Sequence, residues 1–256
     1  MSKQRHLDWD GCFNVRDLGG MRTSGGHETR YGAFVRADTL DYLTATGWMA
    51  LHEYGIRTII DLRNDAEIPS DQAPRPVGIT TVHVPLDDVA DTAFWDYCHA
   101  NDLDGSPLYY RSFLDRKPER CAAALRAIAR AVPGGVVFHC GLGRDRTGLI
   151  SLLLQAISGV LPDESVIDYE LSNSRLGALW AARGREDERP IIAAILARKQ
   201  TSARALLLEF LASLDVAGRL CAAGLSTADV VALRTRLCGP DSSAGNMPAA
   251  PAGQAG

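Results

Sequence analysis

The stretch VVFHCGLGRDRTGLISLLLQAISG, residues 136–159, decides the fold of this chain. Its first four residues, 136–139, predict a short strand, and Pro133-Gly134-Gly135 breaks the chain before it. A glycine-rich loop follows at 140–146. The residues after it, 147–159, form a helical pattern that is apolar nearly all round, and such a helix must be buried in the middle of a domain. Strand, glycine-rich loop and buried helix together predict a loop that presents its backbone to an anion.

The regions on either side of this stretch alternate between strand and helix. Strands are predicted at 33–36, 56–62 and 80–84, and helices at 44–54 and 118–131. The strand at 56–62 is a β-branched run, which is typical of a buried parallel strand. No period holds between 87 and 118, where aromatic and polar residues mix. Strand and helix in alternation favour an α/β fold, with a central, mostly parallel sheet flanked by helices.

The pattern from Pro162 onward is helical throughout. Breaks are predicted near Gly184, at 200–202 and near 225–227, where Ser226 or Thr227 is a suitable N-cap. The Pro/Ala/Gly-rich residues 239–256 lack apolar bulk, so we expect a disordered tail. The sequence therefore predicts a single domain at 1–238, with a helical C-terminal part from about residue 162.

Composition and charge limit the classes of partner. The 256 residues carry a net charge of −4, which argues against nucleic acid or an anionic membrane surface as the main partner. The N-terminal segment lacks the apolar core of a signal peptide, and no apolar run approaches the roughly 20 residues that span a bilayer. We expect a cytoplasmic protein without integral membrane association; export without a signal peptide stays open.

Six cysteines are scattered along the chain, and no two of them form a C-x-x-C pair. Five of them fit buried small hydrophobes or surface thiols, and Cys140 differs through its neighbours. The histidines outside the loop have no metal-ligand spacing, so we expect neither a metal nor a cofactor.

The loop from Cys140 to Arg146 has the composition that a phosphate monoester requires. This dianion needs many N–H donors without side chains in the way, and a glycine-rich loop before a helix N-terminus provides them. Arg146 at the start of the helix can hold two phosphoryl oxygens with its planar guanidinium group. Phosphate contacts are expected from Gly141, Leu142, Gly143, Arg144, Asp145 and Arg146.

A cysteine at the floor of such a cradle is a candidate nucleophile. The helix end, the amides and the guanidinium group that attract phosphate also favour the thiolate form of Cys140. Its attack on phosphorus would give a covalent intermediate. Thr147 is expected to donate its hydroxyl to Cys140 Sγ, which eases departure of the thiolate, and His139 is expected to order the loop.

The leaving oxygen also needs a proton, so a general acid is required. Asp145, inside the loop, is the first candidate. Asp61 is the second, because it ends a predicted parallel strand and ligands bind beyond the carboxyl ends of such strands.

Residues 139–148 resemble the His-Cys-x5-Arg-Thr/Ser-Gly loop of the protein tyrosine phosphatase superfamily. Further matches make the chain similar to the bacterial atypical tyrosine/serine phosphatase family, which also has members that act on phosphoinositides. These matches lie at 14–20, 35–38, 55–63 and 168–173. The resemblance covers roughly residues 10 to 175, with looser helical similarity to about 238.

The resemblance implies a tyrosine phosphatase-like fold, with Cys140 as nucleophile, Arg146 as phosphate clamp, Asp145 as acid and no metal. The chain has Arg144 where the family loop usually has lysine, and Val15 where its N-terminal motif has an aromatic residue. Other charged residues have supporting roles at most. We expect Arg16 and Asp17 to pair and brace the loop, Arg36 and Asp38 either to brace the core or to line the site, and Arg63 to lie at the rim.

The expected substrate is a protein phosphorylated on tyrosine, with serine and threonine as further targets. A phosphoinositide or inositol phosphate phosphatase is the alternative, because Arg144 beside the loop aspartate suits a multiply phosphorylated ring. The acidic chain and the absence of a clear basic amphipathic helix count against a membrane lipid. A phosphate-binding module without catalysis is a further possibility. We expect the aromatic-rich segment 92–113 to form a lid over the site.

Overall fold

Five strands form one sheet in the computed structural model of the chain, which describes residues 4–68, 75–213 and 215–240. Their order is β1-β2-β5-β3-β4, and only β1 runs antiparallel to its neighbour. The strands are β1 Arg16–Asp17, β2 Phe34–Ala37, β3 Ile56–Asp61, β4 Thr80–His83 and β5 Gly135–His139. The predicted, mostly parallel sheet is confirmed. Because β5 lies at its centre, the loop that follows β5 lies at the middle of the carboxyl edge.

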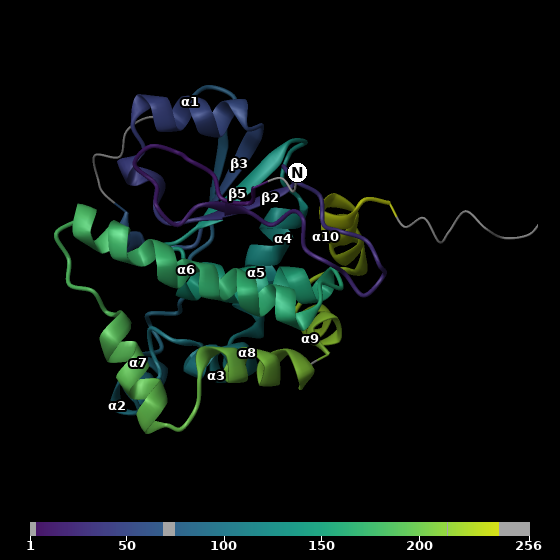
Figure 1. The fold of residues 1–256 in the computed structure, drawn as a ribbon. Coiled ribbons are helices and arrows are strands. Elements are labelled where there is room, and N and C mark those ends of the chain that lie inside the picture. The colour runs from purple at the N-terminus through teal and green to yellow at the C-terminus, as the bar shows by residue number, and fades with distance from the viewer. Residues whose placement is uncertain (1–3, 69–74, 214, 241–256) are drawn as a thin grey trace, which may run out of the picture.

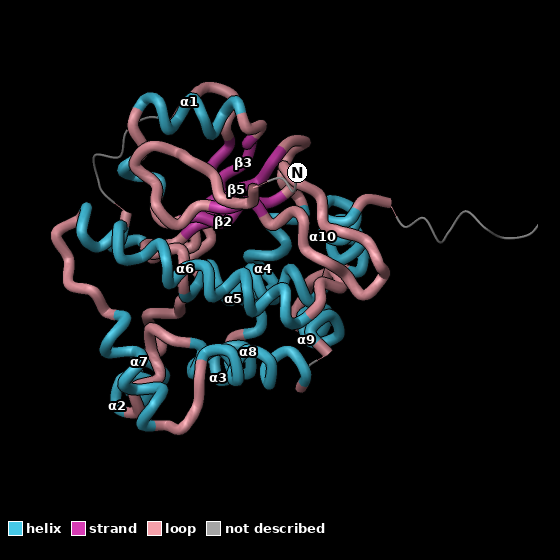
Figure 2. The backbone as a smooth tube through the Cα atoms, in the orientation of Figure 1, coloured by secondary structure: helices cyan, strands magenta, loops and turns pink. Residues whose placement is uncertain are grey.

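Helices cover both faces of the sheet (Figures 1 and 2). They are α1 Ala45–Glu53, α2 Thr92–Ala100, α3 Tyr110–Arg116, α4 Pro118–Ala129, α5 Asp145–Ile157, α6 Pro162–Ala182, α7 Arg189–Arg198, α8 Ala203–Ala212, α9 Val216–Ala222 and α10 Thr227–Cys238. Short 3-10 turns are η1 Leu40–Tyr42, η2 Asp65–Glu67 and η3 Pro107–Tyr109. In Figure 1, α1 lies on one side of the sheet, and α4, α5 and α6 lie on the other.

Alternation along the strands divides the apolar side chains between these two faces. Val35 and Val137 pack in the smaller core with Leu51 of α1, whereas Phe34 and Phe138 pack in the larger core with the other helices. Helix α5 is buried along nearly its whole length, as its sequence predicts. It begins at Asp145 rather than at Thr147, so the last two residues of the predicted loop belong to its first turn.

The region 87–118 contains α2, η3 and α3, which the sequence leaves unassigned. Its buried aromatic residues do not form a lid: Phe94 and Phe113 are fully buried, with ring centroids 6.0 Å apart, in the larger core. Tyr109 and Tyr110 are buried there as well. The expectation of a lid is wrong for these residues, because lifting them would open the core to water.

The C-terminal helices follow the predicted breaks, with one addition. Ser226 caps α10, as expected, by accepting from the Asp229 amide. Between α8 and α9 the chain turns again, and Asp215 caps α9 by accepting from the Gly218 amide at 2.9 Å. Of the predicted tail at 239–256, residues 241–256 lie outside the described residues.

Among the residues that the structure describes, no helix is both long and apolar enough to cross a membrane. The expected cytoplasmic location stays a prediction.

Candidate active site

The carbonyl groups of the loop after β5 are held from outside by residues distant in sequence. The Thr39 amide donates to the Gly141 carbonyl at 3.0 Å, and Asn14 Nδ2 donates to the Leu142 carbonyl at 3.0 Å. Further along the loop, Arg36 Nη2 donates to the Gly143 carbonyl at 2.7 Å, and the Tyr110 hydroxyl donates to the Asp145 carbonyl at 2.8 Å. The carbonyl edge of the loop is therefore occupied by partners.

The amide groups of the loop have the opposite surroundings. Within the described ranges, the amides of residues 141–144 have no hydrogen-bond acceptor. The C=O and N–H of one peptide unit point in opposite directions, so fixing the carbonyls outward leaves the amides inward. Gly143 makes this turn possible: its φ is +69°, and a Cβ there would lie 2.5 Å from the Ala37 carbonyl oxygen. The result is a concave row of donors suited to an anion.

A buried carboxylate on α6, Asp168, anchors the arginines that hold the loop. Arg16 Nε donates to it at 3.0 Å and Arg36 Nη1 at 2.7 Å, and Arg5 is a third partner. Burial opposes ionisation of Asp168, but the three guanidinium charges outweigh it and hold its pKa well below the usual range. Asp168 thus supports the loop indirectly, because it holds Arg36, which donates to the Gly143 carbonyl.

Arg146 is held by two carboxylates at the edge of the loop. Its Nη2 donates to Glu67 Oε1 at 2.7 Å, and its Nη1 lies 3.3 Å from Asp87 Oδ2. A Cβ on Gly141 would lie within 4 Å of both the Glu67 carboxylate and Arg146 Nη2, so these groups stand over the loop. Among the described residues Arg146 Nε has no hydrogen-bond partner. That part of the guanidinium group is left for a phosphoryl oxygen.

Cys140 lies at the base of the loop and is 3% exposed. The preceding His139 is fully buried, and its Nδ1 lies 3.2 Å from the Cys140 carbonyl oxygen. Burial lowers the pKa of His139, which Asp61 only partly offsets, so the ring is neutral near pH 7. The expected hydrogen bond from Thr147 to Cys140 is not formed: Thr147 Oγ1 is buried and has no partner among the described residues.

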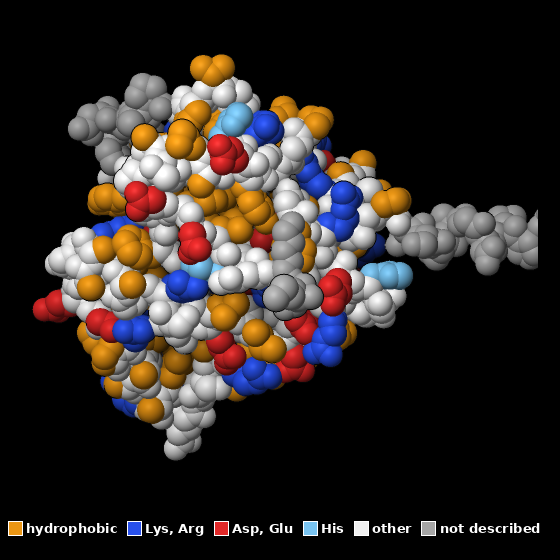
Figure 3. All heavy atoms as spheres, turned by 45° about the horizontal axis from the view of Figure 1, so that its top comes forward, with side chains coloured by type: hydrophobic (Ala, Val, Ile, Leu, Met, Phe, Trp, Pro, Cys, Tyr) orange, Lys and Arg blue, Asp and Glu red, His pale blue; other side chains and the backbone are white. Residues whose placement is uncertain are grey.

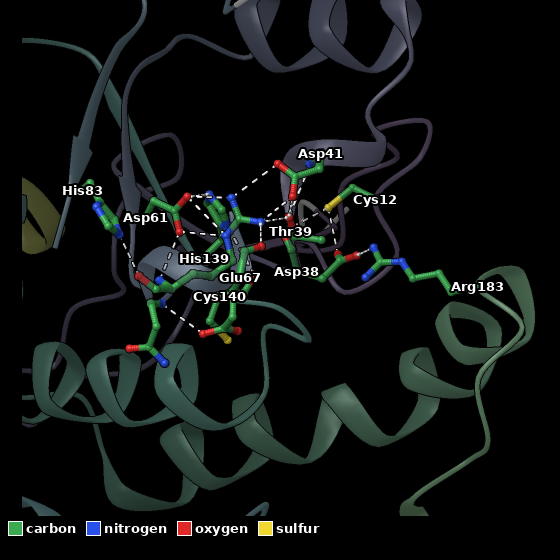
Figure 4. Close-up of polar contacts among 12 residues, drawn as sticks. Cys12, Asp38, Thr39, Asp41, Asp61, Glu67, His83, His139, Cys140 and Arg183 are labelled. Carbon is green, nitrogen blue, oxygen red and sulfur yellow. Dashed lines mark hydrogen bonds and ion pairs between the residues drawn. The ribbon is translucent and has the colours of Figure 1, made fainter. Parts of the chain in front are cut away.

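Asp61 belongs to a buried cluster beside the loop (Figure 4). Arg63 Nη2 donates to Asp61 Oδ2 at 2.7 Å, and His139 Nε2 lies 3.7 Å from the same oxygen. Burial opposes ionisation of Asp61, but the Arg63 hydrogen bond and the neighbouring charges outweigh it and lower its pKa. Arg63 is 2% exposed and also contacts Asp41, so the expectation that it lies at the rim is wrong.

The expected pair of Arg16 and Asp17 does not exist, because successive strand residues point to opposite faces. Arg16 turns toward Asp168, whereas Asp17 accepts from the Tyr54 hydroxyl at 2.6 Å on the other side. Asp38 is fully buried and braces the chain by accepting from the Asn14 amide at 2.8 Å.

Asp145 and Arg144 form a side-on ion pair next to the loop amides. Arg144 Nε lies 3.0 Å from Asp145 Oδ1, and Nη2 lies 3.1 Å from Oδ2. Arg144 Nη2 is also 3.5 Å from Glu188 Oε2. The arginine is 3% exposed, so its charge is turned toward these carboxylates and away from solvent.

Comparison with known proteins shows the family of this chain. A sequence profile described as the tyrosine phosphatase family matches residues 7–239 of the chain. The chain belongs to the tyrosine phosphatase family. A candidate tyrosine-protein phosphatase of Cupriavidus necator is 29% identical over 178 residues, which are 67% of this chain and 64% of that protein. The triple specificity protein phosphatase PtpB of Mycobacterium tuberculosis is 30% identical over 200 residues, covering 67% of this chain and 70% of the relative.

The chain thus spans slightly less than two thirds of the first relative's length. A crystal structure of P. aeruginosa TpbA superposes with a TM-score of 0.42 and 16% identity, over 85% of this chain and 94% of that one. This likeness is too distant to bear on the assignment.

The sequence of this tyrosine phosphatase family member does not identify three residues as part of the site: Glu67, Asp87 and Asp168. Asp87 carries a usable signal, because it follows a predicted strand closed by Pro85, and the argument applied to Asp61 applies to it too. Burial raises the pKa of Asp87, with Arg146 opposing the shift. Asp168 opens the matched stretch 168–173, but its role follows only from its distant partners, and Glu67 gives no signal because its partner Arg146 lies far away in sequence.

Proposed function

We propose that the chain hydrolyses phosphate monoesters on proteins, with phosphotyrosine as the main substrate and phosphoserine and phosphothreonine as further ones. A phosphocysteine on Cys140 is the intermediate. One observation carries this proposal: the nearly enclosed Cys140 thiol lies at the base of a loop whose amides at 141–144 have no acceptor among the described residues, while its carbonyls at 141–143 accept from distant residues. Such a loop stabilises both a thiolate and a phosphoryl group.

The reaction has two steps. The Cys140 thiolate attacks phosphorus, the bond from phosphorus to the ester oxygen breaks, and Asp145 gives its proton to that oxygen. A water molecule then attacks phosphorus, the Asp145 carboxylate takes its proton, and the sulfur–phosphorus bond breaks to return the thiolate. The buried and unpartnered Thr147 hydroxyl is the proposed donor to the departing sulfur.

Arg146 is the proposed clamp for the phosphoryl oxygens. Glu67 and Asp87 hold two of its nitrogens from one side, which reduces the conformational freedom that phosphate binding would otherwise remove. A preorganised guanidinium group stabilises the charge that develops in the transition state.

A relative and the surface charge bear on the substrate class. A relative is named a triple specificity protein phosphatase, so several substrate classes are open to this family. On the face shown in Figure 3, positive and negative side chains are intermixed, and neither sign forms a continuous field. This favours a protein over a phosphoinositide in an anionic membrane, which remains the alternative substrate.

The test is hydrolysis of p-nitrophenyl phosphate in EDTA between pH 5 and 8, followed by acid quenching during turnover. We expect metal-independent release of phosphate, and a phosphoryl group on the peptide that contains Cys140 in the mass spectrum. Phosphotyrosine and phosphoserine peptides and phosphoinositides, compared under the same conditions, then rank the substrate classes. Loss of activity in EDTA, or a phosphoryl group on another residue, would contradict the mechanism.

A pair of carboxylate variants tests the general acid. We expect Asp145→Asn to lower kcat about 10²- to 10⁴-fold for phenyl phosphate, whose leaving group needs the proton, and much less for p-nitrophenyl phosphate. We expect Asp87→Asn to act on both substrates alike and by about tenfold, because it loosens Arg146. Burial raises the pKa of Asp87, so the activity of the wild type should fall at acidic pH as Asp87 becomes protonated. This fall should be missing from the pH–activity profile of Asp87→Asn. The reverse pattern would make Asp87 the acid.

A further inference from the structure

A groove runs beside the phosphate-binding loop, between α7 and the body of the protein. Its cavity measures about 260 Å³. Its walls are mostly apolar: Pro107, Tyr169, Ile192, Ala193, Leu196 and Ala203 contribute to them. Gly105 leaves room at one side, since a Cβ there would lie 3.3 Å from Ile192 Cδ1 and 3.5 Å from Arg144 Nη2. Arg144 joins this groove to the loop, because its backbone belongs to the loop and its side chain lines the groove.

Helix α7 is held at its two ends, and its apolar middle is only partly covered. At the first end Arg189 Nη1 donates to the Asn173 carbonyl at 2.6 Å, and at the last end Arg198 pairs with Asp102. The sequence between them is PIIAAILA, yet no residue of the helix is fully buried. An apolar helix normally buries one face, so this one has an unfilled contact on the side of the groove.

The charges around the groove are already neutralised by the protein. Arg144 pairs with Asp145 and Glu188, and Arg189 pairs with Asp187. Among the described residues, Arg144 uses Nε and Nη2 for these partners, so its charge is already balanced by neighbouring carboxylates. What the groove offers is apolar area.

The groove also has the right position and size for part of a substrate. Arg144 contributes its backbone to the loop and its side chain to the groove wall, so the groove lies next to the phosphate-binding amides. Pockets for whole small molecules measure roughly 300–1,000 Å³, and this one is smaller, as suits a single side chain.

We propose that this groove binds a bulky apolar side chain, such as leucine or phenylalanine, near the phosphorylated residue of the substrate protein. This inference rests on the proposed phosphatase function and names the sequence that it would prefer. The apolar side chain fills the gap under α7, and the phosphate enters the loop.

The test uses phosphotyrosine peptides with leucine or serine at each of the positions flanking the phosphotyrosine. We expect the wild type to prefer leucine at one position by about tenfold in kcat/KM, which is the discrimination that a few methylene groups provide. Ile192→Ser, which removes apolar wall, and Ala193→Trp, which fills the space, should each reduce this preference to less than about twofold. Ile191→Ser is the matched control, because Ile191 is 59% exposed on the same helix and does not line the groove.

Hydrolysis of p-nitrophenyl phosphate separates this inference from the proposed function. That substrate has no side chain to place in the groove, so all three variants should hydrolyse it like the wild type. No turnover of it by the wild type would defeat the phosphatase proposal itself. With turnover present, the groove proposal fails if no position prefers leucine or if Ile191→Ser reduces the preference as much as Ile192→Ser. It fails as well if the groove variants slow hydrolysis of p-nitrophenyl phosphate and of the leucine peptide equally.

Discussion

Cys140→Ser is expected to lower kcat for p-nitrophenyl phosphate by about 10⁴-fold or more, the scale on which loss of a nucleophile acts. A hydroxyl in place of the thiol is a much weaker nucleophile, because serine is not ionised near pH 7 and a neutral hydroxyl attacks phosphorus far more slowly than a thiolate. The loop amides and Arg146 are unchanged by the substitution, so we expect phosphate binding to persist.

The measurement combines steady-state kinetics with the shift in Tm that inorganic phosphate causes. Cys221→Ser is the matched control, since Cys221 is an exposed thiol on α9 and its loss should leave both readings unchanged. Turnover by Cys140→Ser at a rate near that of the wild type would rule out the cysteine mechanism. Loss of activity together with loss of the phosphate-induced Tm shift would show that the variant damages the loop itself.

Asp168→Asn is expected to lower the free energy of unfolding by about 3–5 kcal/mol, the cost of removing one partner from a buried ion pair. The substitution leaves three guanidinium groups, those of Arg5, Arg16 and Arg36, without their buried carboxylate. Because Arg36 also holds the Gly143 carbonyl, kcat/KM should fall along with stability, although Asp168 belongs to α6 and not to the loop.

Urea unfolding of wild type and variant measures this difference. The neighbouring Glu170→Gln is the control: Glu170 is half-buried and makes one long contact with Arg204, so its loss should cost less than about 0.5 kcal/mol. The pKa of Asp168 is lower in the folded state than in the unfolded state. Its contribution to the free energy of unfolding is therefore fully present above the unfolded-state pKa of about 3.9 and is lost as pH falls toward the folded-state pKa. The difference in free energy of unfolding between the wild type and Asp168→Asn should therefore stay constant from pH 7 to about pH 5 and shrink below pH 5. A difference under 1 kcal/mol at pH 7 would contradict the assignment.

Helix and strand positions were largely predictable because they depend on neighbours in the chain. Gly55 ends α1, Ser226 caps α10, and the run before Arg63 forms β3. The region 87–118 was not predictable in this way, since residues such as Phe94 and Phe113 are buried by elements far apart in sequence. Where a segment is packed on several sides, its apolar residues follow no single helix or strand period.

The side-chain partners show the same limit. The neighbours Arg16 and Asp17 looked like a pair, and strand alternation sends them to opposite faces. The sequence does not show which groups face the Arg144 charge, and the fold places Asp145 and Glu188 beside it. A sequence shows that a charge exists, whereas only the fold shows which charge it faces.

The sequence by itself determined the strand, the glycine-rich loop with Cys140 and Arg146, and the buried helix α5, because these parts are contiguous and their geometry follows from local backbone rules. Only the tertiary structure decided what holds that loop open. Asn14, Thr39 and Arg36 take its carbonyls, and Asp168 anchors Arg36. Glu67 and Asp87 hold Arg146, and α7 forms the wall of the groove. Each of these contacts joins residues that are distant in the chain, so none could be set before the sheet and its helices brought them together.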